Sequence, residues 1–252
     1  MRVQILPTAN DLGRTAAQFA SNVINKAIQE QGEARILLST GASQFETLEH
    51  LIQQNIQWSK VTMFHLDEYV NLPDNHSASF IKYLRERFTN FVPLKEVHFV
   101  DGRGDIRCSI QQLTEEIRRA PIDLGLIGIG ENTHLAFNDP PANFNTTDAY
   151  IVVQLDEACK RQQVREGWFE TANDVPNEAI TMTIHQIMQT KVIVSSVPHR
   201  VKAEAIRKTL ENDVTNMIPS TMLKRHSNAT IFLDSQSASS LSESLLRKYT
   251  ME

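Results

Sequence analysis

The chain has 252 residues, of which 41% are hydrophobic and 22% charged, a mixture typical of a globular protein with a sizeable core. Its 25 Lys and Arg residues and 30 Asp and Glu residues give a net charge of −5, which argues against nucleic acid as a partner. The two cysteines, Cys108 and Cys159, are too few for a disulfide framework or a four-cysteine zinc site. We therefore expect a folded protein of a reducing compartment, with a small or neutral partner.

The hydropathy of the chain predicts no membrane attachment. The first ten residues reach Pro7 and polar side chains too soon for the apolar core of a signal peptide. No stretch of about 18 residues is uniformly apolar, so the sequence predicts no transmembrane helix. By elimination, we expect the protein in the cytoplasm.

Short apolar runs of strand type alternate along the chain with longer stretches of helical period. A strand is expected at 3–6, and a helix follows at 11–31, where the apolar residues share one face and Gly32 ends the pattern. Further strands are expected at 34–40, 61–66, 97–100, 124–129, 192–197 and 230–233. Further helices are expected at 43–54, 77–89, 106–119, 201–211 and 237–248.

This alternation predicts the fold. Strands separated by helix-length connections cannot pair as hairpins, so they should lie parallel and be joined by right-handed crossovers. We predict an α/β fold, a Rossmann-like three-layer sandwich with a mainly parallel sheet flanked by helices. No linker, repeat or low-complexity run divides the chain, so residues 1–252 are expected to form a single domain. Ligands of such sheets bind beyond the carboxyl ends of the strands, which makes the loops there the candidate site.

The loop after the second strand, Ser39-Thr40-Gly41-Ala42-Ser43, consists of small residues. Free backbone N–H groups and hydroxyls in such a turn can hold a phosphate or another anion. The alternative is a tight strand-to-helix turn with Ser43 as the helix N-cap. A Walker A loop is excluded, because the second glycine and the lysine of that motif are absent.

The third strand and its exit loop put three ionisable groups, His65, Asp67 and Glu68, at a strand end. While the strand lasts, its two-residue period points His65 and Asp67 the same way, and a carboxylate there could act as a base. The alternatives are ordinary polar residues of an exit loop, or metal ligands together with His76. Because the four residues lack a recognised ligand spacing, we expect no metal site.

Two glycines at the end of the strand expected at 124–129, Gly128 and Gly130, are spaced like the start of a dinucleotide-binding motif. Thr133 stands where the third glycine would be, and Pro140-Pro141 prevents the helix that would carry the pyrophosphate. The glycines therefore predict a tight turn and no nicotinamide site.

The same loop contains three polar residues that could act together, Asn132, His134 and Asp139. His134 and Asp139 can form an imidazole–carboxylate pair, which tunes a proton donor or acceptor. The alternative is a loop histidine without a catalytic role.

The loop after the strand at 192–197 contains His199, Arg200 and Lys202. It offers cations at the start of a helix, where an anion gains from both the charge and the helix dipole. The alternative is a solvated helix face.

Taken together, these segments resemble the family of glucosamine-6-phosphate deaminases, also called isomerases, and the related 6-phosphogluconolactonases. Residues 40–43 are similar to the family's phosphate loop, residues 65–70 to its Asp-Glu-Tyr segment, and residues 130–139 to its Gly-x-Asp-Gly-His-Ile-Ala-Phe-Asn-Glu signature. The run Leu135-Ala-Phe-Asn138 is of the deaminase type, which favours amino-sugar chemistry. The resemblance covers nearly the whole chain.

The resemblance implies conversion of glucosamine 6-phosphate and water to fructose 6-phosphate and ammonia, without a metal or a cofactor. His134, oriented by Asp139, would move a proton at the ring oxygen to open the pyranose. Asp67 would then carry a proton from C2 to C1 through an enolamine. Asn132 belongs to the same catalytic loop.

The resemblance also implies a phosphate grip formed by Ser43, Lys202 and the backbone after Gly41. The charged and Gln-rich stretch 156–176 corresponds to the family's mobile lid, and Arg161 or Arg165 in this stretch would complete the grip. The expected partner is a phosphorylated sugar, neither nucleic acid nor a membrane is expected, and a homo-oligomer is left open.

Three residues depart from the family's pattern. Asn132 replaces the usual Asp, and since an amide cannot take up a proton, a relay through this position would be shortened. Thr133 adds a Cβ to a turn that Gly makes freely, and Asp139 is shorter than the usual Glu, so both changes could move the imidazole. The alternatives are a related sugar-phosphate isomerase, such as one for galactosamine 6-phosphate, a 6-phosphogluconolactonase-like hydrolase, and a non-catalytic sugar-phosphate sensor.

Overall fold

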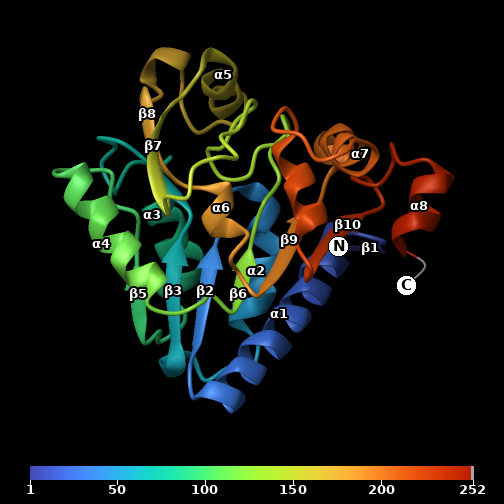
Figure 1. The fold of residues 1–252 in the computed structure, drawn as a ribbon, viewed down its shortest axis with the longest axis horizontal. Coiled ribbons are helices and arrows are strands. Elements are labelled where there is room, and N and C mark those ends of the chain that lie inside the picture. The colour runs from blue at the N-terminus through green and yellow to red at the C-terminus, as the bar shows by residue number, and fades with distance from the viewer. Residues whose placement is uncertain (251–252) are drawn as a thin grey trace.

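The computed structural model describes residues 1–250, and its centre is a sheet of seven parallel strands (Figure 1). In chain order the strands are β1 (Arg2–Leu6), β2 (Ala34–Leu38), β3 (Val61–His65), β5 (Glu96–His98), β6 (Leu124–Leu126), β9 (Val192–Val197) and β10 (Ala229–Asp234). In space they follow the order β1-β10-β9-β6-β2-β3-β5, and each neighbouring pair is parallel. The predicted mainly parallel α/β sheet is confirmed.

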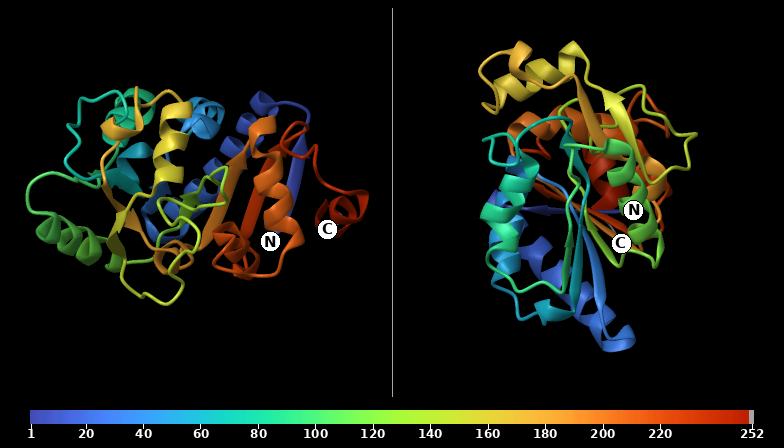
Figure 2. Two further views of the ribbon diagram at one scale, coloured as in Figure 1. Left: turned by 90° about the horizontal axis from the view of Figure 1, so that it is seen from above. Right: turned by 90° about the vertical axis from the view of Figure 1, so that its left-hand side faces the viewer.

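Helices cover both faces of this sheet (Figure 2). They are α1 (Ala9–Gln31), α2 (Phe45–Ile52), α3 (Phe80–Leu84), α4 (Ile106–Arg118), α6 (Ile184–Ile187), α7 (Ala203–Glu211) and α8 (Glu243–Thr250). Because side chains alternate along a strand, Ile36 and Leu38 of β2 join the apolar core under α1, α2 and α3. Leu37 joins the opposite core, which α4, α6, α7 and α8 cover. No helix of residues 1–250 is long and apolar enough to cross a membrane.

A second, antiparallel sheet stands over the carboxyl ends of the parallel strands, and the sequence did not predict it. It consists of β4 (Asp67–Tyr69), β8 (Glu178–Met182) and β7 (Tyr150–Gln154), in that order. A further helix, α5 (Glu157–Arg165), joins it through a third apolar cluster that includes Tyr69, Cys159 and Phe169. Figure 1 shows α5 at the top of the molecule, above the large sheet.

Several predicted elements are shorter than expected. The strands expected at 34–40 and 124–129 end at Leu38 and Leu126, and the helix expected at 237–248 begins at Glu243. The N–H of Ser39 still donates to the carbonyl of Leu126 at 2.9 Å, and the N–H of Ile127 donates to the carbonyl of Val194 at 2.9 Å. Beyond these bonds both segments leave the sheet. The early endings free these segments to form the loops of the candidate site.

Candidate active site

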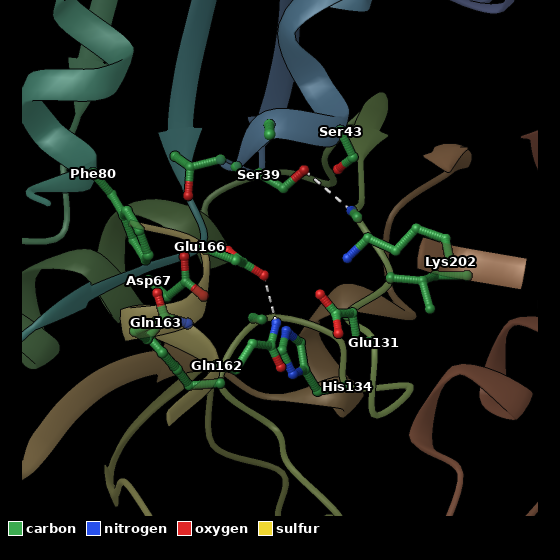
Figure 3. A pocket seen from close by; sticks show the side chains of 18 of the residues that line it. Ser39, Ser43, Asp67, Phe80, Glu131, His134, Gln162, Gln163, Glu166 and Lys202 are labelled. Atoms are coloured by element: carbon green, nitrogen blue, oxygen red, sulfur yellow. Dashed lines mark hydrogen bonds between the residues drawn. The ribbon is translucent and has the colours of Figure 1, made fainter. Parts of the chain in front are cut away.

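A pocket lies at the carboxyl ends of β2, β3, β6 and β9, where the four candidate loops of the sequence analysis, those that follow these strands, meet (Figure 3). Its lining includes the predicted residues Thr40, Gly41, Ala42, Ser43, Asp67, His134 and Lys202. Asn132 and Asp139 are hydrogen-bonded behind His134 and do not line it. The rule for open parallel sheets therefore located the pocket correctly.

The loop of small residues lines the pocket and leaves backbone N–H groups without a partner among residues 1–250. Gly41 has a φ of 104°, and its carbonyl accepts hydrogen bonds from the Tyr83 hydroxyl at 2.8 Å and from the Gln44 N–H at 3.1 Å. Ala42 and Ser43 are the first residues of a short helical turn, so their N–H groups have no partner within it. Ser43 does not cap α2, contrary to the alternative considered above, and its hydroxyl lines the pocket.

Lys202 reaches the pocket from the loop after β9. The N–H of His199 donates to the Asp234 carboxylate at 3.1 Å, and the N–H of Lys202 donates to the His199 carbonyl at 3.0 Å, so the base of the loop is fixed. Burial lowers the pKa of Lys202, although Glu166 and Glu131 act in the opposite direction. A bound anion would compensate for the water that this ammonium has lost.

Asp67 and Glu68 open strand β4 and point to opposite sides of it. Asp67 lines the pocket, whereas Glu68 is buried and accepts hydrogen bonds from the N–H groups of Tyr69 and Ile81 at 2.9 Å. Burial, followed by repulsion from Glu68 and Asp139, raises the pKa of Asp67 well above its usual value. Burial raises the pKa of Glu68 to about 7. Because Asp67 faces the pocket and its burial favours the protonated form, it is the candidate proton carrier.

The two-residue period of the strand suggested that His65 and Asp67 point the same way. The structure contradicts this, because Asp67 lines the pocket and His65 does not. Strand β3 ends at His65, and Asp67 already belongs to the antiparallel sheet. His65 is completely buried, with its ring edge-on to Phe80 and Phe99 at centroid distances of 6.4 and 6.2 Å. His76 lies elsewhere, stacked on a phenyl ring. Within residues 1–250, no three His, Cys, Asp or Glu side chains group to hold a metal ion.

Burial of His65 should make stability depend on pH. Neither ring nitrogen has a partner among residues 1–250, and burial lowers the pKa of His65 to about 3 from 6.5. Between these values the unfolded chain binds a proton that the folded protein does not, so stability falls as the pH decreases from 6.5 toward 3. When the pH is lowered from 7 to 5, the free energy of unfolding of the wild type should fall by roughly 2 kcal/mol more than that of His65→Leu, as measured by urea denaturation. A difference that stays constant over this range would contradict the assignment.

His134 and Asp139 form the predicted pair, with His134 Nδ1 3.0 Å from Asp139 Oδ1. The shorter Asp therefore reaches the imidazole. Asn132 does not touch the ring: its Nδ2 donates to Asp139 at 2.7 Å, and its Oδ1 accepts the His134 backbone N–H at 3.2 Å. Burial would raise the pKa of Asp139, but hydrogen bonds from His134, Asn132 and the Cys159 thiol lower it overall. Thr133 completes the turn at a φ of 74°, in the left-handed region that Gly would enter freely.

Because Gly130 has no side chain, the His134 ring can lie directly against it. The N–H of Gly130 donates to the His134 carbonyl at 3.0 Å, and a Cβ at this position would lie 2.3 Å from ring atoms Nε2 and Cε1. Gly130→Ala should therefore displace the imidazole and lower turnover by about 100-fold, the usual effect of misplacing a catalytic group by about 1 Å. Steady-state kinetics check this result, with the thermal midpoint as the control for folding. Unchanged turnover in a folded variant would show that the ring position does not matter.

The stretch 156–176 contributes different side chains from those expected. Arg161 is exposed and does not line the pocket, and Arg165 is paired with Glu131 at 2.7 Å. The lining residues from this stretch are Gln162, Gln163, Glu166 and Trp168. Sequence reasoning missed them because it searched for a cation. For Gln162, Gln163 and Glu166 the spacing was a usable signal, since residues three and four apart on a helix are neighbours, whereas Trp168 lies beyond the end of α5.

Comparison with known proteins agrees with the geometry. The family model described as glucosamine-6-phosphate isomerases/6-phosphogluconolactonase matches residues 7–232. A glucosamine-6-phosphate deaminase of Bacillus thuringiensis (strain Al Hakam) is 30% identical over 246 residues, which are 97% of this chain and 91% of the relative. The deaminase of Bacillus cereus (strain B4264) is 29% identical over the same length.

Solved structures extend the comparison. The structure of a monomeric glucosamine-6-phosphate deaminase superposes with a TM-score of 0.86 at 28% identity, over 96% of this chain and 100% of that one. A 6-phosphogluconolactonase from Thermotoga maritima shares the fold, with a TM-score of 0.76 at 16% identity over 92% of this chain and 98% of that one. The resemblance seen in the loops is thereby confirmed. The chain belongs to the family of glucosamine-6-phosphate isomerases and 6-phosphogluconolactonases.

Proposed function

We propose that this chain is a glucosamine-6-phosphate deaminase, which converts glucosamine 6-phosphate and water to fructose 6-phosphate and ammonia. The observation that carries the proposal is that Asp67 and His134 line the same pocket as Lys202 and the loop 41–43, the candidate anion site. Relatives named glucosamine-6-phosphate deaminase, 29% and 30% identical over 97% of the chain, support it.

In the proposed reaction, the loop 41–43 and Lys202 hold the phosphate, and this remote binding positions the sugar. His134, oriented by Asp139, moves a proton at the ring oxygen and opens the pyranose. Asp67 then takes the proton from C2 and returns it to C1. Water adds to the imine carbon that results at C2, and ammonia leaves. The raised pKa of Asp67 suits a group that both accepts and returns a proton.

The charges of the pocket favour an amino sugar over a lactone. Its lining contains three carboxyl groups, those of Asp67, Glu131 and Glu166, and one ammonium, that of Lys202. Glu131 is paired with Arg165, whereas Glu166 makes no ion pair with any of residues 1–250. A substrate with an ammonium at C2 brings a positive charge to these carboxylates, and a lactone brings none.

A coupled assay for ammonia and fructose 6-phosphate tests the proposal directly. We expect equal amounts of both products from glucosamine 6-phosphate, more slowly or not at all from galactosamine 6-phosphate, and no hydrolysis of 6-phosphogluconolactone. Binding measured by calorimetry runs beside the assay. Tight binding of glucosamine 6-phosphate without ammonia release would contradict the proposal and identify a sensor.

Replacement of Lys202 by Ala should weaken the binding of glucosamine 6-phosphate on the order of 10- to 100-fold, because a charge-assisted hydrogen bond to the phosphate is lost. Unphosphorylated glucosamine should bind equally to both proteins. Lys208→Ala is the matched control, since Lys208 lies on α7 with its side chain 48% exposed and only a 3.8 Å pair with Glu204. If Lys202→Ala bound the sugar phosphate as tightly as the wild type, the phosphate site would lie elsewhere.

A further inference from the structure

Gln163 is a pocket residue whose side-chain oxygen has a hydrogen-bond partner and whose side-chain nitrogen has none among the described residues. It lies on α5, its exposed fraction is 6%, and it lines the pocket. Its Oε1 accepts a hydrogen bond from the Tyr69 hydroxyl at 2.8 Å. Its Nε2 makes no hydrogen bond with any residue of the described chain. The neighbouring Gln162 differs, because its Nε2 donates to Glu166 Oε1 at 2.8 Å.

The Tyr69 hydroxyl determines which way this amide faces. Tyr69 is fully buried, and its hydroxyl has no other acceptor within residues 1–250. Burial raises the pKa of Tyr69 well above its usual value, so the hydroxyl keeps its proton and has to donate it. Only Oε1 of the amide can accept that proton. Nε2 is therefore turned away from Tyr69 and toward the pocket.

The free amide lies next to the candidate proton carrier. Tyr69 and Asp67 are two residues apart on β4, so their side chains lie on the same side of the strand. Figure 3 shows the side chain of Gln163 beside that of Asp67. Gln163 is 6% exposed as a residue and lines the pocket, so an acceptor for its free N–H group can come from a ligand bound there.

We propose that Gln163 Nε2 donates a hydrogen bond to a substrate oxygen on a carbon adjacent to the one at which Asp67 moves a proton, with Tyr69 as the positioning residue. This inference rests on the proposed function, in which that carbon is C2 and the acceptor is the oxygen on C1 or C3. Gln163 then acts on the orientation of the reacting carbons, a role that a distant phosphate grip cannot fill.

Gln163→Leu removes the donor and should lower kcat/KM for glucosamine 6-phosphate about tenfold, the usual effect of losing one neutral hydrogen bond. It also leaves the Tyr69 hydroxyl without an acceptor, so the thermal midpoint should fall. Adding Tyr69→Phe removes that orphaned hydroxyl and should restore the thermal midpoint but not kcat/KM. As a second route, Gln163→Glu keeps an acceptor for Tyr69 but has no N–H group, and it should show the same loss of kcat/KM.

The double variant separates a ligand role from a structural one. If kcat/KM recovers together with the thermal midpoint, the amide serves only Tyr69, and the inference is wrong while the proposed deaminase activity stands. If the wild type binds glucosamine 6-phosphate without releasing ammonia, Kd replaces kcat/KM in the comparison of the single and double variants. A Kd that stays weakened in the double variant supports the ligand role, and a Kd that recovers contradicts it. If the wild type neither binds nor converts it, the proposed function and the inference both fail.

Discussion

Replacement of Asp67 by Asn should lower kcat for glucosamine 6-phosphate by a factor on the order of 10²–10⁴, while the affinity for the sugar phosphate changes little. Asn keeps the shape of the side chain but cannot take a proton from C2. The Asp67 carboxyl makes no hydrogen bond with residues 1–250 and lines the pocket, so its proton-carrying capacity is available to a substrate. Product formation gives kcat, and exchange of the C2 proton with deuterated solvent, followed by NMR, reports the step itself.

Glu68→Gln is the matched control for this variant, because it makes the same chemical change one residue further along β4. Glu68 points away from the pocket and accepts hydrogen bonds from backbone N–H groups. The amide nitrogen of Gln is a donor and cannot accept them. It should therefore lower stability and leave kcat within a few-fold of the wild type. Near-normal C2 exchange in Asp67→Asn would assign proton transfer to another group.

Replacement of His134 by Gln should lower turnover of the closed sugar by a similar factor, on the order of 10²–10⁴. The reason is specific to ring opening: Gln can form hydrogen bonds but cannot transfer a proton at the ring oxygen. An acyclic analogue has already passed that step, so its rate of C2 proton exchange should fall far less. The ratio of the two losses is the measurement.

His185→Gln is a suitable comparison, since His185 is an exposed residue of α6 outside the pocket lining. It should leave both rates unchanged. Equal losses for the closed and acyclic compounds in the His134 variant would mean that the imidazole serves a later step, or that the loop has collapsed. The thermal midpoint distinguishes these two explanations.

The parallel sheet could be predicted because its strands are buried on both faces. All five residues of β3 are buried, and three of them, Val61, Met63 and Phe64, are apolar, so the strand reads as a mainly apolar run. The antiparallel sheet could not be found this way. β4 has only three residues and starts with two acids, and in β7 only Tyr150 is buried. Strand β8 lies between them and places Thr181 opposite Asp67, a pairing between distant segments that no local pattern contains.

The site was predictable where residues follow parallel strands and unpredictable where a helix folds over them. Asp67, His134 and Lys202 follow strands, whose ends meet at one edge of the sheet. Gln163 enters the pocket because of the way α5 packs, which is a tertiary property. For Asn132, sequence reasoning saw only a missing charge. The structure uses the amide as a donor to Asp139, a role in which a second carboxylate would be repelled.

The pairing of the first strand with the last has a consequence for how the chain is made. Residues 2–6 of β1 lie parallel to residues 230–234 of β10, and among residues 1–250 β1 pairs with no other strand. At a synthesis rate of about 5–20 residues per second, β1 therefore waits on the order of 10–50 s for its neighbour to leave the ribosome. Until then the strand beside Val3, which is buried in the folded protein, and Ile5, which is partly buried, is missing. An incomplete chain thus carries an open strand with apolar residues, and through this strand nascent copies of the protein would associate.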